Sequence, residues 1–88
     1  MNVLDSRFLG NVDIDVGLKF GQYAVSKRGA GSWEQTQFYM TIDEVADSVR
    51  TIADNYHGSA GVHVDLRDPD IIHLKRVLID NRKISVYP

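Results

Sequence analysis

One loop of this 88-residue chain gathers several residue types that bind other molecules. The run Lys27–Trp33 supplies two cations, two glycines, a serine hydroxyl and an indole. Glycines let backbone amides approach an anion, and an indole can stack on a base or fill a partner's pocket. The loop matches neither common phosphate-binding pattern, G-x-x-x-x-G-K-S/T or G-x-G-x-x-G. We therefore predict partner binding by Lys27, Arg28 and Trp33, with a plain hairpin loop and a buried Trp33 as the alternative.

Two pairs of basic residues near the C-terminus form a second candidate binding group. Between Ile71 and Pro88 the chain has four cations and a single anion, Asp80, which makes this region locally basic. Such a group could meet phosphate or an acidic protein surface. Cations on an edge strand also protect a sheet from aggregation, which is the alternative explanation. The four residues are Lys75, Arg76, Arg82 and Lys83.

His63 and Asp65 are the residues whose spacing best fits acid–base chemistry. They lie two positions apart, so on a strand they project from the same face. A histidine beside an aspartate could act as an oriented general base. If Asp13 and Asp15 lay on the neighbouring strand, the cluster could also hold a divalent cation. Alternating polar residues are also typical of the wet face of a sheet, and we predict no catalytic, cofactor-binding or metal-binding residue.

The element that can be placed with most detail is a helix at 42–57. Thr41 and Glu44 form a capping box, in which each side chain accepts a hydrogen bond from the backbone of the other residue. Gly58 is a natural end, because glycine readily adopts the left-handed conformation found after many helices. The apolar residues recur at steps of three and four, as on one face of a helix. They are Ile42, Val45, Ala46, Val49, Ile52, Ala53 and Tyr56.

Three strands are predicted before this helix and one after it. Asn11–Phe20 alternates strictly between apolar and polar residues, which indicates a half-buried strand. Gln22–Arg28 and Trp33–Tyr39 are joined by the glycine loop and predict a hairpin. Val62–Leu66 has the same alternation after the helix. The residues of the first strand that should face the core are Val12, Ile14, Val16, Leu18 and Phe20.

The segment 69–80 fits two structures. Asp68-Pro69-Asp70 can begin a helix or form a type I turn. In a helix, the apolar residues would spread over more than half of the circumference and would enclose Lys75. In a β-hairpin they would share one face, and the β-branched content also favours strands. We predict the hairpin, with a helix at 69–80 as the alternative; its shared face would consist of Val77, Ile79, Ile84 and Val86.

These elements predict an α+β fold and a single domain over residues 1–88. A mainly antiparallel sheet of about five to six strands would pack one face on the helix at 42–57. The predicted order is βββαβ followed by a C-terminal hairpin, or βββαβαβ if 69–80 is helical.

The composition and the longest apolar runs exclude several kinds of protein. The chain has no cysteine, which excludes disulfides, thiolate metal sites and a cysteine nucleophile. A net charge of −2 gives no overall attraction to nucleic acid or to anionic lipid. The longest strongly apolar run, Val77–Ile79, is far too short to cross a membrane. Met1–Gly10 has no apolar core of a signal peptide. We expect a soluble, cytoplasmic protein.

The expected function is that of a small non-enzymatic module that binds a protein partner. An inhibitor, an immunity-type protein, a phage accessory protein or an assembly subunit would fit this description. Binding of nucleic acid by the Lys27–Trp33 loop and the C-terminal cations is the alternative. A small enzyme using His63 and Asp65 is a third hypothesis. We expect no cofactor and no membrane partner, and the sequence leaves open a homo-oligomer.

Overall fold

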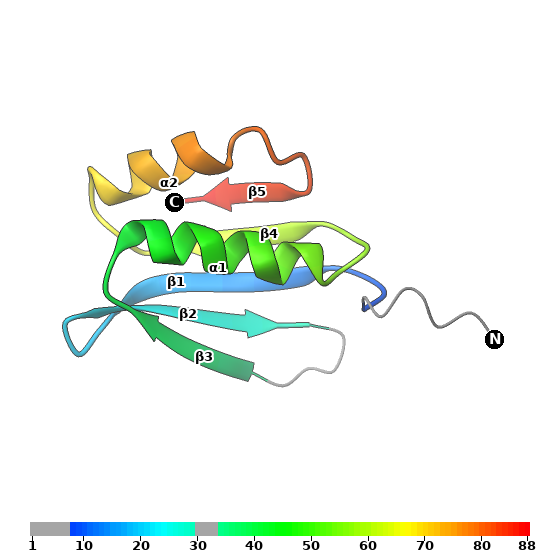
Figure 1. Cartoon of the computed structure of the whole chain (residues 1–88), viewed down its shortest axis with the longest axis horizontal. Coiled ribbons are helices and arrows are strands. Elements are labelled where there is room, and N and C mark those ends of the chain that lie inside the picture. The colour runs from blue at the N-terminus through cyan, green and yellow to red at the C-terminus, as the bar shows by residue number, and fades with distance from the viewer. Residues whose placement is uncertain (1–7, 30–33) are drawn as a thin grey trace.

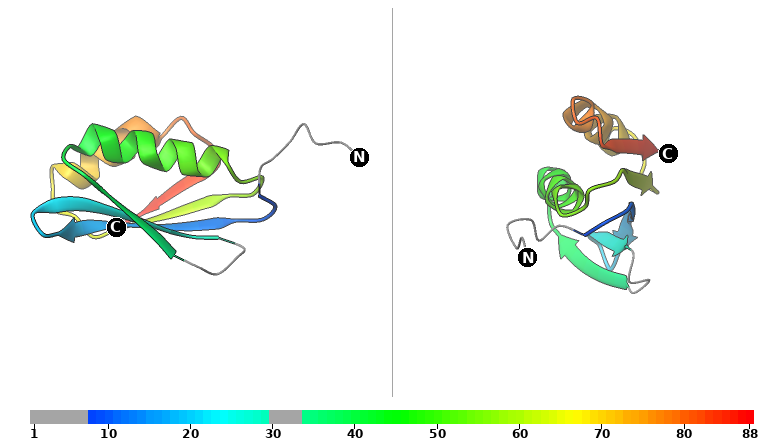
Figure 2. Two further views of the ribbon diagram at one scale, coloured as in Figure 1. Left: turned by 60° about the horizontal axis from the view of Figure 1, so that its bottom comes forward. Right: turned by 90° about the vertical axis from the view of Figure 1, so that its right-hand side faces the viewer.

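The protein is a five-stranded mixed sheet with two helices packed on one of its faces (Figures 1 and 2). The computed structural model describes residues 8–29 and 34–88. The strands lie side by side in the order β3-β2-β1-β4-β5. The elements along the chain are β1 (Val12–Lys19), β2 (Gln22–Arg28), β3 (Glu34–Tyr39), α1 (Ile42–Asp54), β4 (Ala60–Val64), α2 (Asp70–Leu78) and β5 (Ile84–Tyr87).

The predicted α+β class is confirmed, but the sheet is mixed rather than mainly antiparallel. β1 pairs antiparallel with β2, and β2 pairs antiparallel with β3. β4 is parallel to both β1 and β5, because a helix precedes β4 and another precedes β5. A helical crossover returns the chain to the same end of the sheet, which makes consecutive strands parallel. The observed order is therefore the alternative one, βββαβαβ.

The central strand, β1, has one face toward the core and one toward solvent, as the alternation of its residues predicts. Val12, Ile14 and Val16 are at most 2% exposed and face the helices. Leu18 and Phe20 do not continue this series, although the alternation assigns both to the core. Leu18, near the end of β1, is 61% exposed. β1 ends at Lys19, and Phe20 lies in the following turn with 91% of its surface exposed. The prediction of a buried Phe20 is wrong because the period of two ends where the hairpin turns.

α1 begins as predicted and ends three residues earlier than predicted. The Glu44 amide donates to Thr41 Oγ1 over 3.2 Å, and the Thr41 amide donates to Glu44 Oε1 over 3.0 Å, which completes the capping box. The helix ends at Asp54 with Asn55 in the right-handed conformation, so Gly58 does not end it. Gly58 instead allows a close approach, since an added Cβ would overlap the carbonyl of Gly10.

The predicted C-terminal hairpin is wrong, and a helix occupies this part of the chain. Ile71, Leu74 and Leu78 are buried at the spacing of one helical face. Asp70 in the first turn and the cations in the last turn both favour the helix dipole. Burial of these three side chains outweighs the preference of β-branched residues for strands.

Each helix receives a cation from a distant part of the chain at its C-terminal end. Lys83 Nζ donates to the carbonyl oxygens of Ala53, over 2.7 Å, and Tyr56. Arg50 Nη2 donates to the carbonyl oxygen of Val77 in the last turn of α2, over 2.8 Å. The last turn of α1 has no basic residue of its own, so Lys83 supplies the charge that its dipole favours. These contacts tie α1 to α2 and to the start of β5.

We predict that Lys83→Met lowers the free energy of unfolding by about 2 kcal/mol, because it removes two charge-assisted hydrogen bonds to backbone carbonyls. Arg82→Met is the matched control, since Arg82 is exposed beside it, and this variant should change the free energy by less than about 0.5 kcal/mol. Urea unfolding followed by circular dichroism measures both. Equal midpoints for the two variants would show that the Lys83 contacts do not stabilise the fold.

A second polar contact joins β2 to the beginning of α2. The Tyr23 hydroxyl donates to Asp70 Oδ2 over 2.7 Å. This hydrogen bond, together with burial and the negative charge of Asp70, raises the pKa of Tyr23 above its usual value of 10.0. The folded state therefore holds the phenolic proton more tightly than the unfolded state does. The resulting stabilisation is complete below pH 10 and is lost as the pH rises through the raised pKa.

We predict that Tyr23→Phe is less stable than the parent protein at neutral pH, and that the difference shrinks as the pH rises above about 10. Urea unfolding at a series of pH values measures this difference. The same series in an Asp70→Asn background is the control, because that background lacks the carboxylate. A stability difference between the parent and Tyr23→Phe that stays constant into the alkaline range would contradict the assignment.

Candidate functional site

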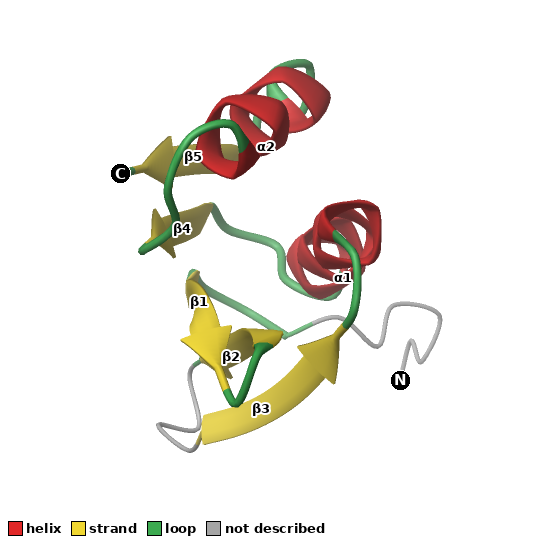
Figure 3. Cartoon of the chain, turned by 90° about the vertical axis from the view of Figure 1, so that its left-hand side faces the viewer, coloured by secondary structure: helices red, strands yellow, loops and turns green. Residues whose placement is uncertain are grey.

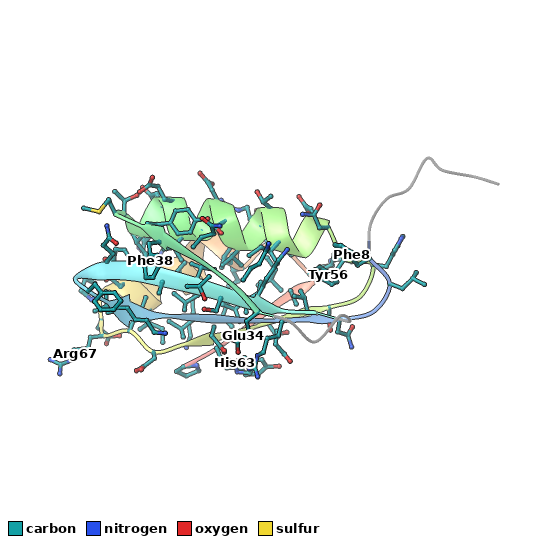
Figure 4. The ribbon with its side chains drawn as sticks, turned by 90° about the horizontal axis from the view of Figure 1, so that it is seen from below. Phe8, Glu34, Phe38, Tyr56, His63 and Arg67 are labelled. Atoms are coloured by element: carbon teal, nitrogen blue, oxygen red, sulfur yellow. The ribbon has the colours of Figure 1, made fainter. Side chains whose placement is uncertain are left out.

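The face of the sheet opposite the helices is not covered by any element of the described residues. We call it the open face. Figure 4 shows Glu34 and His63 on this side of the sheet, away from α1. The cross-strand register assigns its members. They are Asp13, Asp15, Gly17, Ala24, Ser26, Arg28, Glu34, Thr36, Phe38, Gly61, His63, Ser85 and Tyr87.

At the C-terminal end of β2, the open face carries a small charge cluster around Arg28. Arg28 Nη2 lies 3.3 Å from Asp15 Oδ2, and its Nε lies 4.0 Å from Glu34 Oε1. The side chains of Arg28 and Asp15 are about half exposed, so such pairs add at most about 1 kcal/mol of stability. The cluster pairs the guanidinium with one carboxylate from each neighbouring strand.

His63 lies beside this cluster and pairs with a carboxylate from the neighbouring strand. β4 is adjacent to β1, and His63 Nε2 lies 3.6 Å from Asp13 Oδ1. The imidazole also stacks on the ring of Tyr87, with 5.3 Å between ring centroids. Asp65 follows the end of β4, where its amide donates to the carbonyl of Val16. Within residues 8–29 and 34–88, no three histidine or acidic side chains are grouped closely enough to hold a metal ion.

The structure does not bring the predicted cations together. Lys27 and Arg28 project to opposite sides of β2, and Lys27 lines a hollow of about 270 Å³ between β3 and α1. Lys75 and Arg76 are exposed on α2. The expected patch across a C-terminal hairpin does not form, because α2 replaces the hairpin and Lys83 is bonded to α1. The remaining two predicted residues are Arg82, which is exposed, and Trp33, which lies outside the described residues.

A group of exposed apolar side chains at one end of the open face was not identified from the sequence. We call Phe20, Phe38 and Met40 the aromatic corner; their exposed fractions are 91%, 44% and 69%. The ring centroids of Phe20 and Phe38 are 6.4 Å apart. Gln22 Nε2 lies 3.2 Å from the sulfur of Met40, which joins the β1–β2 turn to the end of β3. The corner therefore combines residues from the β1–β2 turn and from the end of β3.

The backbone of Phe20 is in an unfavourable conformation for a bulky residue. Phe20 and Gly21 form the two-residue turn between β1 and β2, with φ values of 53° and 73°. Two consecutive positive φ angles are typical of a type I′ turn, whose preferred residues are asparagine, aspartate and glycine. For other L-residues the left-handed conformation costs about 1–2 kcal/mol. The sequence signal for this turn was a two-residue connection ending in glycine between two alternating segments.

Comparison with known proteins does not place the chain in a family. No protein-family model matches the sequence, and no curated protein is detectably similar to it. In the described part of the chain, neither helix is long and apolar enough to cross a membrane.

Proposed function

We propose that this protein is a small interaction module that binds a protein partner through the aromatic corner. The observation that carries the proposal is Phe20, an almost fully exposed aromatic residue in a turn that disfavours it. Strained backbone conformations cluster at binding and functional sites, because function can require a side chain that the fold alone does not favour. The exposed Phe20 ring adds almost no buried apolar surface to the folded chain, and a phenylalanine at this position also strains the turn.

The surroundings of the corner suit a protein partner. Aromatic residues and methionine are enriched at the centres of protein–protein interfaces, where they supply most of the binding free energy. Charged side chains around such a centre mainly set orientation and association rate. Lys19 lies next to Phe20, and Gln22 contacts the sulfur of Met40. The corner thus has the apolar centre and polar surroundings of an interface.

Nucleic acid is less well supported as the partner. Binding to phosphates needs several cations on one surface. Here Lys83 is bonded to α1, and Arg28 lies between two carboxylates. The remaining predicted cations are distributed over different elements.

We predict that Phe20→Asn changes stability and binding in opposite directions. Asparagine tolerates the left-handed conformation, so the free energy of unfolding should rise by about 0.5–1 kcal/mol. Loss of the ring should weaken partner binding by about 2 kcal/mol. Urea unfolding measures the first effect. Quantitative affinity capture from cells of the native source, followed by titration calorimetry with the purified partner, measures the second.

The matched control is Leu9→Asn, which removes an exposed apolar side chain from outside the corner. A partner of the aromatic corner should be retained by the parent protein and by Leu9→Asn, and should be lost with Phe20→Asn. A partner retained equally by all three proteins would place the binding surface elsewhere. A drop in stability with Phe20→Asn would show that the ring serves the fold instead.

A further inference from the structure

One edge of the sheet has backbone groups directed toward solvent. In residues 8–29 and 34–88, β5 is the outermost strand on the side opposite β3 and pairs with β4 alone. The Ala60 amide donates to the carbonyl of Lys83 over 2.8 Å. In a parallel ladder, successive residues turn their backbone groups to alternate sides. The amide of Val86 and the carbonyls of Ile84 and Val86 therefore point away from β4, where another strand could pair with them.

α2 lies along this edge and carries an amphipathic surface beside it (Figures 1 and 3). Ile71, Leu74 and Leu78 face the core, so residues about a quarter of a turn away form a separate flank. Two isoleucines on this flank are exposed, Ile72 by 46% and Ile79 by 82%. Two cations lie between them along the helix. We call this set the edge flank; it consists of Ile72, Lys75, Arg76 and Ile79.

The edge flank and β5 border a common hollow. The volume of this hollow is about 350 Å³. It is lined by three residues at the end of α2, Lys75, Leu78 and Ile79, and by Ile84 and Val86 of β5. The opposite flank of α2 is occupied by α1. His73 Nε2 lies 2.9 Å from Asp43 Oδ1, and Arg50 bonds to the carbonyl of Val77. The hollow is therefore on the side of α2 that faces away from α1.

The order of side chains along the edge flank suits an added strand, while its steps are slightly shorter than those of a strand. α2 runs opposite to β5, so the flank passes from Ile79 through Lys75 and Arg76 to Ile72 along the direction of β5 (Figure 1). Steps of three or four helical residues cover about 5 Å. Side chains on one face of a strand repeat at about 6.7 Å. Three successive side chains on one face of the added strand would thus meet an isoleucine, a cation and an isoleucine in turn.

We infer that the β5 edge accepts an extended segment of a partner protein as an additional strand, with the pattern apolar-x-acidic-x-apolar. Backbone hydrogen bonds to β5 supply affinity in this recognition mode, and pockets for alternate side chains supply specificity. The two cations of the edge flank require the acidic residue at the centre of the pattern. The pattern is the same in both chain directions, so parallel and antiparallel addition both satisfy it. This inference does not depend on the aromatic corner.

The test uses a synthetic peptide with free ends blocked and the central sequence Val-Thr-Glu-Thr-Val. A control peptide has lysine in place of glutamate. Both are titrated into ¹⁵N-labelled protein, and amide exchange is measured by NMR. The glutamate peptide should bind more tightly, should shift resonances of Ile79 and Val86, and should slow exchange of the Val86 amide. Ser85 is the internal control, because its amide already points toward β4 and its exchange should change less.

Two exposed positions supply variants that keep the fold. Lys75→Glu should weaken binding of the glutamate peptide several-fold and strengthen binding of the lysine peptide. Ile79→Ser should weaken both peptides, whereas Leu9→Ser should weaken neither. Phe20→Asn should leave peptide binding unchanged, which separates this inference from the proposed function. Equal affinity for the two peptides, or unchanged Val86 exchange at saturation, would overturn the inference.

Discussion

The structure depends on the strict alternation of β1, the central strand of the sheet. Val12, Ile14 and Val16 are buried on one side, while Asp13 and Asp15 occupy the other. A helix can bury its apolar face only against the first side, because packing it on the aspartates would strand charges without water. Both helices therefore lie on one face, and the second face stays in solvent (Figure 2). The position of the open face follows from this division.

The second half of the chain is held to the first by a few polar contacts as well as by apolar packing. Lys83 and Arg50 each satisfy carbonyls at the end of a helix from a distant position. These bonds fix α2 beside α1 and direct its opposite flank toward the edge of the sheet. The exposed Ile72 and Ile79 are then a consequence of where α2 is anchored. The same two residues are the reason that the apolar pattern of α2 is too broad for a helix that buries one stripe.

Local signals in the sequence predicted the elements whose pattern is set within one segment. The structure contains the capping box at Thr41 and the buried stripe of α1. It also has the predicted inward and outward faces of β1 as far as Val16. The segment 69–80 could not be assigned because its apolar residues serve two surfaces, the core and the edge flank. Phe20 was misplaced because a periodic pattern does not show where a hairpin turns. The predicted binding role of Trp33 falls on residues that the structure does not describe.

The central claim is that the exposed apolar residues of the β1–β2 turn and β3 form a binding surface. It is tested most directly by mapping the footprint of a recovered partner on the ¹⁵N-labelled protein, using cross-saturation transfer from the partner to the backbone amides. If the corner is the binding surface, saturation should reach Phe20, Gly21, Phe38 and Met40 most strongly. Saturation confined to the outer face of α1, around Asp47 and Asp54, would contradict it.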